Sequence, residues 1–206
     1  MIRVKVCGMN SPDGVDAAVE AGADWIGFVF FPASPRAVTP AQAAALSGRH
    51  HGGPKRVGLF VAPTEAQIAE VLEALPLDVL QLYVDEPRAA ALRARFGLSV
   101  WRAVGVTAAG DLPAEAGGAD GFLIEPAPPP NATRPGGNAV ALDWSLLAGW
   151  TAPAPWLLAG GLTPENVAEA IRASGASAVD VSSGVERHRG VKDPALIRAF
   201  VAAARG

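Results

Sequence analysis

The stretch KRVGLFVAPTEAQIAEVLEALPLDVLQLY, residues 55–83, joins two apolar runs through one amphipathic segment. Its first and last runs are apolar on consecutive positions, which is typical of parallel strands covered on both faces. The segment between them predicts a helix over 64–75, with Thr64 and Gln67 in the spacing of a capping box. The stretch therefore predicts one strand–helix–strand unit with parallel strands.

The same pattern runs along the whole chain. Strands are predicted at 2–7, 25–31, 55–61, 78–83, 99–106, 121–125, 156–161 and 177–184. Helices are predicted at 13–22, 39–48, 64–75, 86–96, 108–116, from Asp143, at 163–174 and at 193–204. Eight such units without a break in composition predict an α/β protein, a single (β/α)8 barrel domain over 1–206.

An open doubly wound sheet is the alternative fold. That fold would need fewer strands, and it normally carries a glycine-rich turn after the first strand. Here the first strand runs into VCGMN, residues 6–10, which holds a single glycine. The closed barrel is therefore the favoured interpretation.

Composition narrows the functional class. The chain has 206 residues, half of them hydrophobic, and a net charge of −3 without clustered Lys and Arg, which argues against a nucleic-acid surface. No apolar stretch approaches the roughly 20 residues of a membrane span, and no signal-peptide core is visible. Cys7 is the single cysteine, so a disulfide framework is excluded. We expect a cytoplasmic protein that binds neither nucleic acid nor membrane.

Candidate functional residues follow from position. In a barrel of this type the active site lies at the carboxyl ends of the strands. The residues predicted at those ends are Cys7, Arg36, Tyr83, Glu125, Gly160, Gly161, Ser182, Ser183 and Gly184. The two glycine- and serine-rich turns follow strands seven and eight, where barrels often bind phosphate through backbone N–H groups. After strand six comes a long proline-rich loop, residues 126–141, and loops of this length often contact substrate.

Several of these motifs resemble the phosphoribosylanthranilate isomerase family of tryptophan biosynthesis. The similar segments are VKVCG, GADWIGFVFFPASPRAVTP, LAGGLTPENV and AVDVSSGVERHRGVKD, and the resemblance covers nearly the whole chain. It implies a (β/α)8 barrel that uses no cofactor and no metal and acts as a monomer or a homodimer. It also implies an Amadori rearrangement of a phosphorylated small molecule, N-(5-phosphoribosyl)anthranilate, from aminoaldose to aminoketose.

The resemblance also implies roles for individual residues. Cys7 takes the place of the general base, and Arg36 that of the group that holds the anthranilate carboxylate. The turns at Gly160–Gly161 and Ser182–Gly184 take the place of the phosphate site. Glu125 stands where the family has the aspartate that serves as general acid.

Three positions depart from the family pattern. Glu125 replaces aspartate, Tyr83-Val84 replaces His-Gly, and the loop reads GGNA, residues 136–139, where the family has GGxG. These departures leave alternative functions open. Tyr83 is expected to be a substrate-binding residue. The protein could be a related aminosugar-phosphate isomerase or lyase with another substrate, or a phosphate-ligand binding protein without catalysis. Retention of both Cys7 and Arg36 argues against the last of these.

Overall fold

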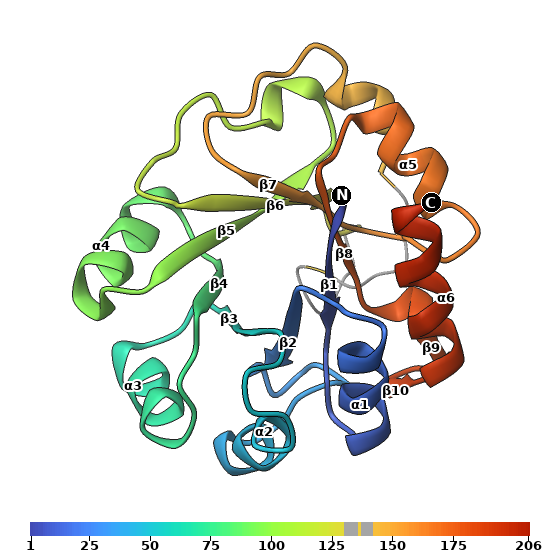
Figure 1. The fold of residues 1–206 in the computed structure, drawn as a ribbon. Coiled ribbons are helices and arrows are strands. Elements are labelled where there is room, and N and C mark those ends of the chain that lie inside the picture. Colours follow the sequence, from blue (N-terminus) through green and yellow to red (C-terminus); the bar gives the residue numbers. More distant parts are fainter. Residues whose placement is uncertain (130–135, 137–141) are drawn as a thin grey trace.

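The computed structural model describes residues 1–129, 136 and 142–206 and shows a closed barrel of eight parallel strands ringed by helices (Figure 1). The barrel strands are β1 Arg3–Cys7, β2 Trp25–Val29, β3 Lys55–Val61, β4 Val79–Tyr83, β5 Ser99–Val106, β6 Gly121–Pro126, β7 Trp156–Leu158 and β8 Ala178–Val181. The order β1 to β8 follows the chain, and β8 pairs with β1. The predicted barrel is confirmed, and the open sheet is excluded.

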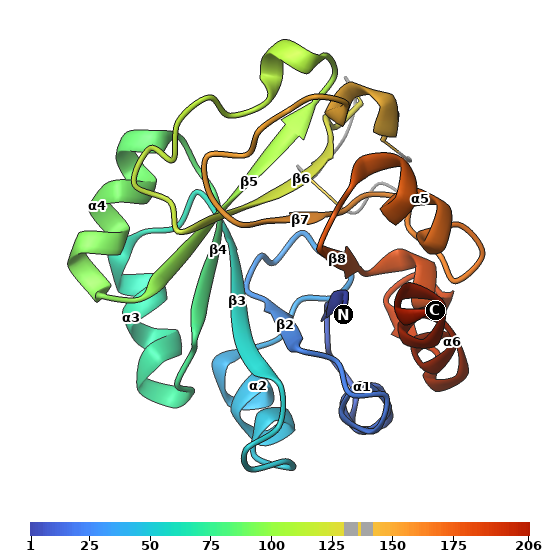
Figure 2. The ribbon, with the colours of Figure 1, turned by 45° about the horizontal axis from the view of Figure 1, so that its top comes forward.

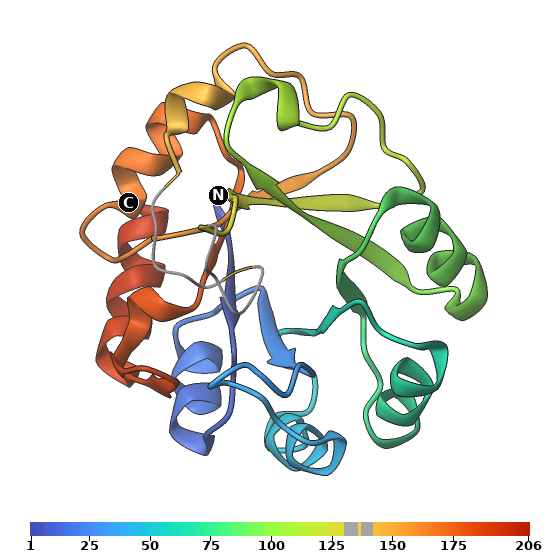
Figure 3. The same ribbon diagram turned by 180° about the vertical axis from the view of Figure 1, so that it is seen from behind.

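Six α-helices lie in the described part of the chain, outside the strands in every view (Figures 2 and 3). They are α1 Pro12–Glu20, α2 Pro40–Ser47, α3 Glu65–Ala74, α4 Glu86–Phe96, α5 Val167–Ser174 and α6 Pro194–Arg205. Short 3-10 helices span Ala109–Asp111, Trp144–Leu147 and Ser183–Val185, and a small hairpin pairs β9 Glu186–His188 with β10 Val191–Lys192. The capping box of Thr64 and Gln67 forms as predicted, with both reciprocal hydrogen bonds.

One predicted helix is wrong. Residues 108–116 contain only the 3-10 turn Ala109–Asp111, and Leu112 is already extended. Pro113 explains this difference, because a proline disfavours the helical conformation of the residue before it. The Asp111 carboxylate accepts hydrogen bonds from the backbone N–H groups of Thr107 and Ala108, which stabilises the turn instead. The short helix predicted from Asp143 is present as the 3-10 helix Trp144–Leu147, with Asp143 as its N-cap.

The barrel interior is apolar at its amino-terminal end. Trp25 and Trp101 meet edge to face there with ring centroids 5.2 Å apart. They pack with buried side chains from other strands, namely Val57, Val79, Leu123, Leu157 and Ala178. Because these side chains fill the amino-terminal half, the strands open toward solvent at the carboxyl end, where the polar interior residues lie.

The two ends of the chain meet beside the closure of the barrel. Arg205 in α6 donates to the backbone oxygen of Gly22 at 2.7 Å and to the Asp24 carboxylate at 3.0 Å. Asp24 in turn accepts from the backbone N–H of Val4 in β1. These contacts tie the last helix to the first two strands and so support the β1–β8 seam.

Most of the proline-rich loop that the sequence predicts over 126–141 lies outside the described residues. Its first residue, Pro126, is the end of β6, and Gly136 is described as part of the barrel mouth. In the portion of the chain that the structure describes, no helix is long and apolar enough to cross a membrane.

Candidate active site

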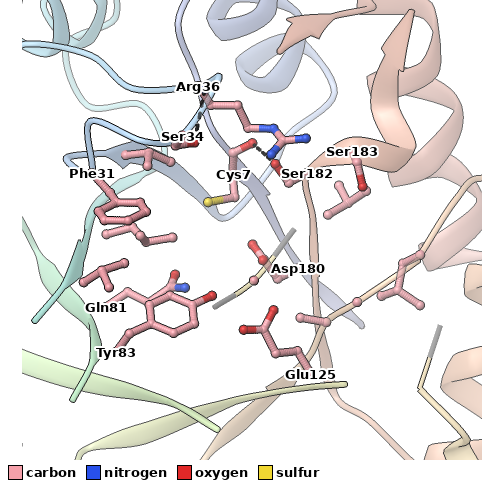
Figure 4. Close-up of a pocket in the computed structure, with 18 of the residues that line it drawn as sticks. Cys7, Phe31, Ser34, Arg36, Gln81, Tyr83, Glu125, Asp180, Ser182 and Ser183 are labelled. Atoms are coloured by element: carbon pink, nitrogen blue, oxygen red, sulfur yellow. Dashed lines mark hydrogen bonds between the residues drawn. The ribbon is translucent and has the colours of Figure 1, made fainter. Parts of the chain in front are cut away.

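A pocket opens at the carboxyl end of the barrel and gathers most of the predicted site residues. Cys7, Arg36, Tyr83, Glu125, Gly160, Gly161, Ser182 and Ser183 all line it, and Figure 4 shows the labelled side chains converging on one space. Gly184 does not line it. A Cβ at Gly184 would collide with the backbone oxygen of Leu162, so this glycine lets the loops after β7 and β8 pack against each other.

Cys7 ends β1 with a thiol that is only 4% exposed and borders the pocket. Burial raises the pKa of the Cys7 thiol, and the nearby Lys5 ammonium opposes that effect without cancelling it. Lys5 is fully buried and also forms an ion pair with Asp180, Nζ to Oδ1 at 2.7 Å. Because strand side chains alternate, Lys5 lies on the same inner face as Cys7, one layer deeper. A cation is thus held where it can stabilise the thiolate.

Glu125 lies near the end of β6 and is 5% exposed. Burial raises the pKa of its carboxyl to about 8, against the lowering effect of a hydrogen bond with Tyr83. The carboxyl therefore holds its proton at neutral pH, which a general acid requires. Burial beside Glu125 also raises the pKa of the Tyr83 hydroxyl well above its usual range, so this hydroxyl stays a donor.

Arg36 is buried at the pocket wall within a network of charges. Its Nε and Nη2 donate to the two carboxylate oxygens of Glu186 at 2.6 and 2.9 Å. Lys192 donates to the same Glu186 at 2.9 Å and to the Ser182 backbone oxygen at 2.8 Å. Burial alone would raise the pKa of Glu186, but Arg36 and Lys192 bring it down to about 2. Glu186 uses two of the five N–H donors of Arg36, and no other described residue accepts from this guanidinium.

The turn after β7 has two consecutive glycines in the left-handed region, Gly160 at φ +89° and Gly161 at φ +62°. Residues with a Cβ rarely adopt this conformation, so the turn needs glycine at both positions. Ser182 and Ser183 face the same part of the pocket from the turn after β8. Backbone groups and hydroxyls are thereby exposed to the pocket at the place where barrels commonly hold phosphate.

The chain matches a family model described as N-(5'phosphoribosyl)anthranilate (PRA) isomerase over residues 4–203. A protein of Acidiphilium cryptum named N-(5'-phosphoribosyl)anthranilate isomerase is 59% identical over 204 residues, which are 99% of this chain and 98% of that protein.

Solved structures of phosphoribosylanthranilate isomerases are similar to this chain over its whole length. A phosphoribosylanthranilate isomerase in complex with reduced 1-(o-carboxyphenylamino)-1-deoxyribulose 5-phosphate is 34% identical, with a TM-score of 0.82 and full coverage of both chains. Monomers generated from the dimeric isomerase of Thermotoga maritima superpose with a TM-score of 0.85 at 33% identity, again with full coverage of both.

This chain belongs to the phosphoribosylanthranilate isomerase family. Its membership confirms the predicted enzyme class, an intramolecular oxidoreductase of the aldose–ketose isomerase type in tryptophan biosynthesis.

The predicted site residues did not include three polar residues inside the barrel of this isomerase. Lys5, Gln81 and Asp180 are at most 7% exposed and stand two positions before Cys7, Tyr83 and Ser182 respectively. Period-two alternation would have found them, because each shares the inner face with the predicted residue that follows it. A lysine, a glutamine or an aspartate in an otherwise apolar buried strand was the available signal. Among the described residues no group of three His, Cys, Asp or Glu side chains has the arrangement of a metal site.

Proposed function

We propose that the barrel mouth converts N-(5'-phosphoribosyl)anthranilate to the aminoketose with Glu125 as general acid and Cys7 as general base. The observation that carries this assignment is the pair of proton-handling groups in one pocket, with Glu125 held protonated at neutral pH and Cys7 beside a buried cation.

The steps follow from the two groups. Glu125 gives its proton to the ribose ring oxygen while the bond from that oxygen to C1′ breaks, which leaves an open-chain Schiff base. The Cys7 thiolate then removes the proton from C2′, and the electron pair of that C–H bond forms the C1′=C2′ bond of an enolamine. Loss of the C2′ hydroxyl proton and protonation of C1′ give the ketone. Protons are conserved overall, as an isomerisation requires.

The remaining site residues would hold the two ends of the substrate. Arg36 would bind the anthranilate carboxylate through the N–H groups that Glu186 does not use. The phosphate would lie against Gly160, Gly161, Ser182 and Ser183. Tyr83 would face the substrate while it holds Glu125.

The test is turnover of freshly prepared phosphoribosylanthranilate, followed as loss of its fluorescence. We expect wild type to reach at least about 10⁴ M⁻¹s⁻¹ in kcat/KM, an ordinary enzyme value. Cys7→Ser and Glu125→Gln should each lose at least about 100-fold, the usual contribution of one proton-transfer group. Glu125→Asp should keep activity, because it retains the acid. Wild-type activity in the Cys7→Ser or Glu125→Gln protein would remove that residue from the mechanism.

A further inference from the structure

Gln81 is the middle residue of the inner face of β4, between the apolar layer at Val79 and the mouth at Tyr83. It is 1% exposed and lines the same pocket as Cys7 and Glu125. Its partners in register on the neighbouring strands are Leu59 and Trp101. The strands on both sides therefore give it no charged or amide neighbour.

Neither polar atom of the Gln81 side chain has a hydrogen-bond partner among the residues that the structure describes. On the same inner face Lys5 and Asp180 are paired with each other, whereas Oε1 of Glu125 is, like the amide, without a partner among the described residues. A buried amide without partners is costly, and the large majority of buried side-chain polar groups avoid that state. A leucine would occupy the same volume without the cost. The Gln81 amide therefore destabilises the folded protein, and folding alone does not explain why this position holds a glutamine.

The direction of the side chain shows where its partner comes from. Figure 4 draws the Gln81 amide pointing into the pocket, in the space that Tyr83 and Cys7 also face. An amide offers donors at Nε2 and an acceptor at Oε1. Carboxylates and phosphates only accept hydrogen bonds, so they could pair with Nε2 but not with Oε1. A sugar hydroxyl both donates and accepts, and so it matches the whole group.

We propose that the Gln81 amide is a substrate-binding group that holds the sugar hydroxyl at C2′. Nε2 donates a hydrogen bond to the hydroxyl oxygen, and Oε1 accepts the hydrogen bond that the hydroxyl donates. This inference rests on the function proposed above, in which Cys7 removes the hydrogen from that same carbon. As C2′ becomes a carbonyl, Nε2 still donates to its oxygen, so the contact persists into the ketone.

The test is the variant Gln81→Leu, which removes both polar atoms and nearly keeps the volume. Two lost neutral hydrogen bonds should lower kcat/KM by about 10- to 100-fold. The affinity for the reduced carboxyphenylamino-deoxyribulose phosphate, measured by calorimetry, should fall by a similar factor. Inhibition by inorganic phosphate should be unchanged, because the proposed phosphate site lies at the turns after β7 and β8 and does not include Gln81. The urea midpoint should rise, because an unpaired amide has left the core.

The matched control is Gln67→Leu, the same chemical change in the exposed capping box of α3. It should lower the urea midpoint and leave kcat/KM unchanged, which is the opposite pattern in both readouts. If Gln81→Leu instead lost stability, or kept kcat/KM within about twofold of wild type, the amide would be a structural group and the inference would be overturned. Failure of the proposed function is a separate result, since it would show as absent turnover in the wild type.

Discussion

Glu125→Gln should make the protein more stable by an amount that grows with pH. The folded protein binds a proton at Glu125 with a pKa of about 8 because the carboxyl is buried, whereas the unfolded chain has the ordinary value of 4.5. Below pH 4.5 both states are protonated, and the group affects stability little. Between pH 4.5 and about pH 8, Glu125 is deprotonated in the unfolded chain but keeps its proton in the folded protein. The stability of the wild type therefore falls as pH rises through this range. Glutamine has no proton to lose and escapes this cost.

The magnitude follows from the two pKa values. They lie about 3.5 apart, and each pKa unit corresponds to about 1.36 kcal/mol, so the full effect is about 5 kcal/mol above pH 8. At pH 7 the difference between the variant and wild type should already be about 3 kcal/mol. The carboxyl is 5% exposed, so solvent screens little of this energy. An effect of this size is a large share of the stability of an ordinary domain.

The assay is equilibrium unfolding in urea at pH 5, 6, 7, 8 and 9, with both proteins in the same buffers. Groups other than Glu125 titrate alike in the two proteins, so the difference isolates this one carboxyl. The matched control is Glu115→Gln, the same change at an exposed position, which should alter stability little at any pH. A difference between Glu125→Gln and wild type that stayed flat from pH 5 to 9 would refute the protonated, buried acid.

Two further substitutions test the surroundings of the acid and of Arg36. Tyr83→Phe removes the hydrogen bond that lowers the pKa of Glu125, so the apparent pKa near 8 in the pH profile of kcat/KM should move upward; an equal loss of rate at every pH would instead indicate a lost contact only. Glu186→Gln leaves the cations of Arg36 and Lys192 side by side without their shared anion. The free energy of unfolding in urea near pH 7 should therefore fall by about 3–5 kcal/mol. An unchanged urea midpoint would mean that these ion pairs do not stabilise the fold.

Much of the barrel could be predicted because its signals are local. Strands β3 and β5 and helix α4 have the predicted bounds, since buried apolar runs and capping residues are read from neighbouring positions. The failure at 108–116 has a local cause too, because Pro113 outweighs the helix preference of the alanines before it. The loop predicted over 126–141 from its prolines stays a prediction, because most of it lies outside the described residues.

The site could be predicted in outline, and its internal partners could not. Cys7, Arg36 and Glu125 follow from the rule that strand ends carry the chemistry. The pairing of Arg36 with Glu186 joins residues 150 positions apart, and no local pattern shows it. If Arg36 binds the substrate as proposed, its pairing with Glu186 fixes the guanidinium beforehand and leaves less side-chain entropy to lose on binding.

Two of the departures from the family pattern touch each other in the folded chain. Glu125 and Tyr83 come from different strands, yet both line the mouth of the barrel, and the interaction with Tyr83 lowers the pKa of the Glu125 carboxyl against the effect of its burial. A glutamate reaches about one methylene farther than an aspartate and needs support at its new position, because misplacement by about 1 Å can cost 100-fold in rate. The Tyr83 hydroxyl, which comes from β4 on the other side of β5, is the group that could supply that support. If Glu125 is the general acid, as we propose, the two changes act as one, because the phenol then holds the longer acid in place.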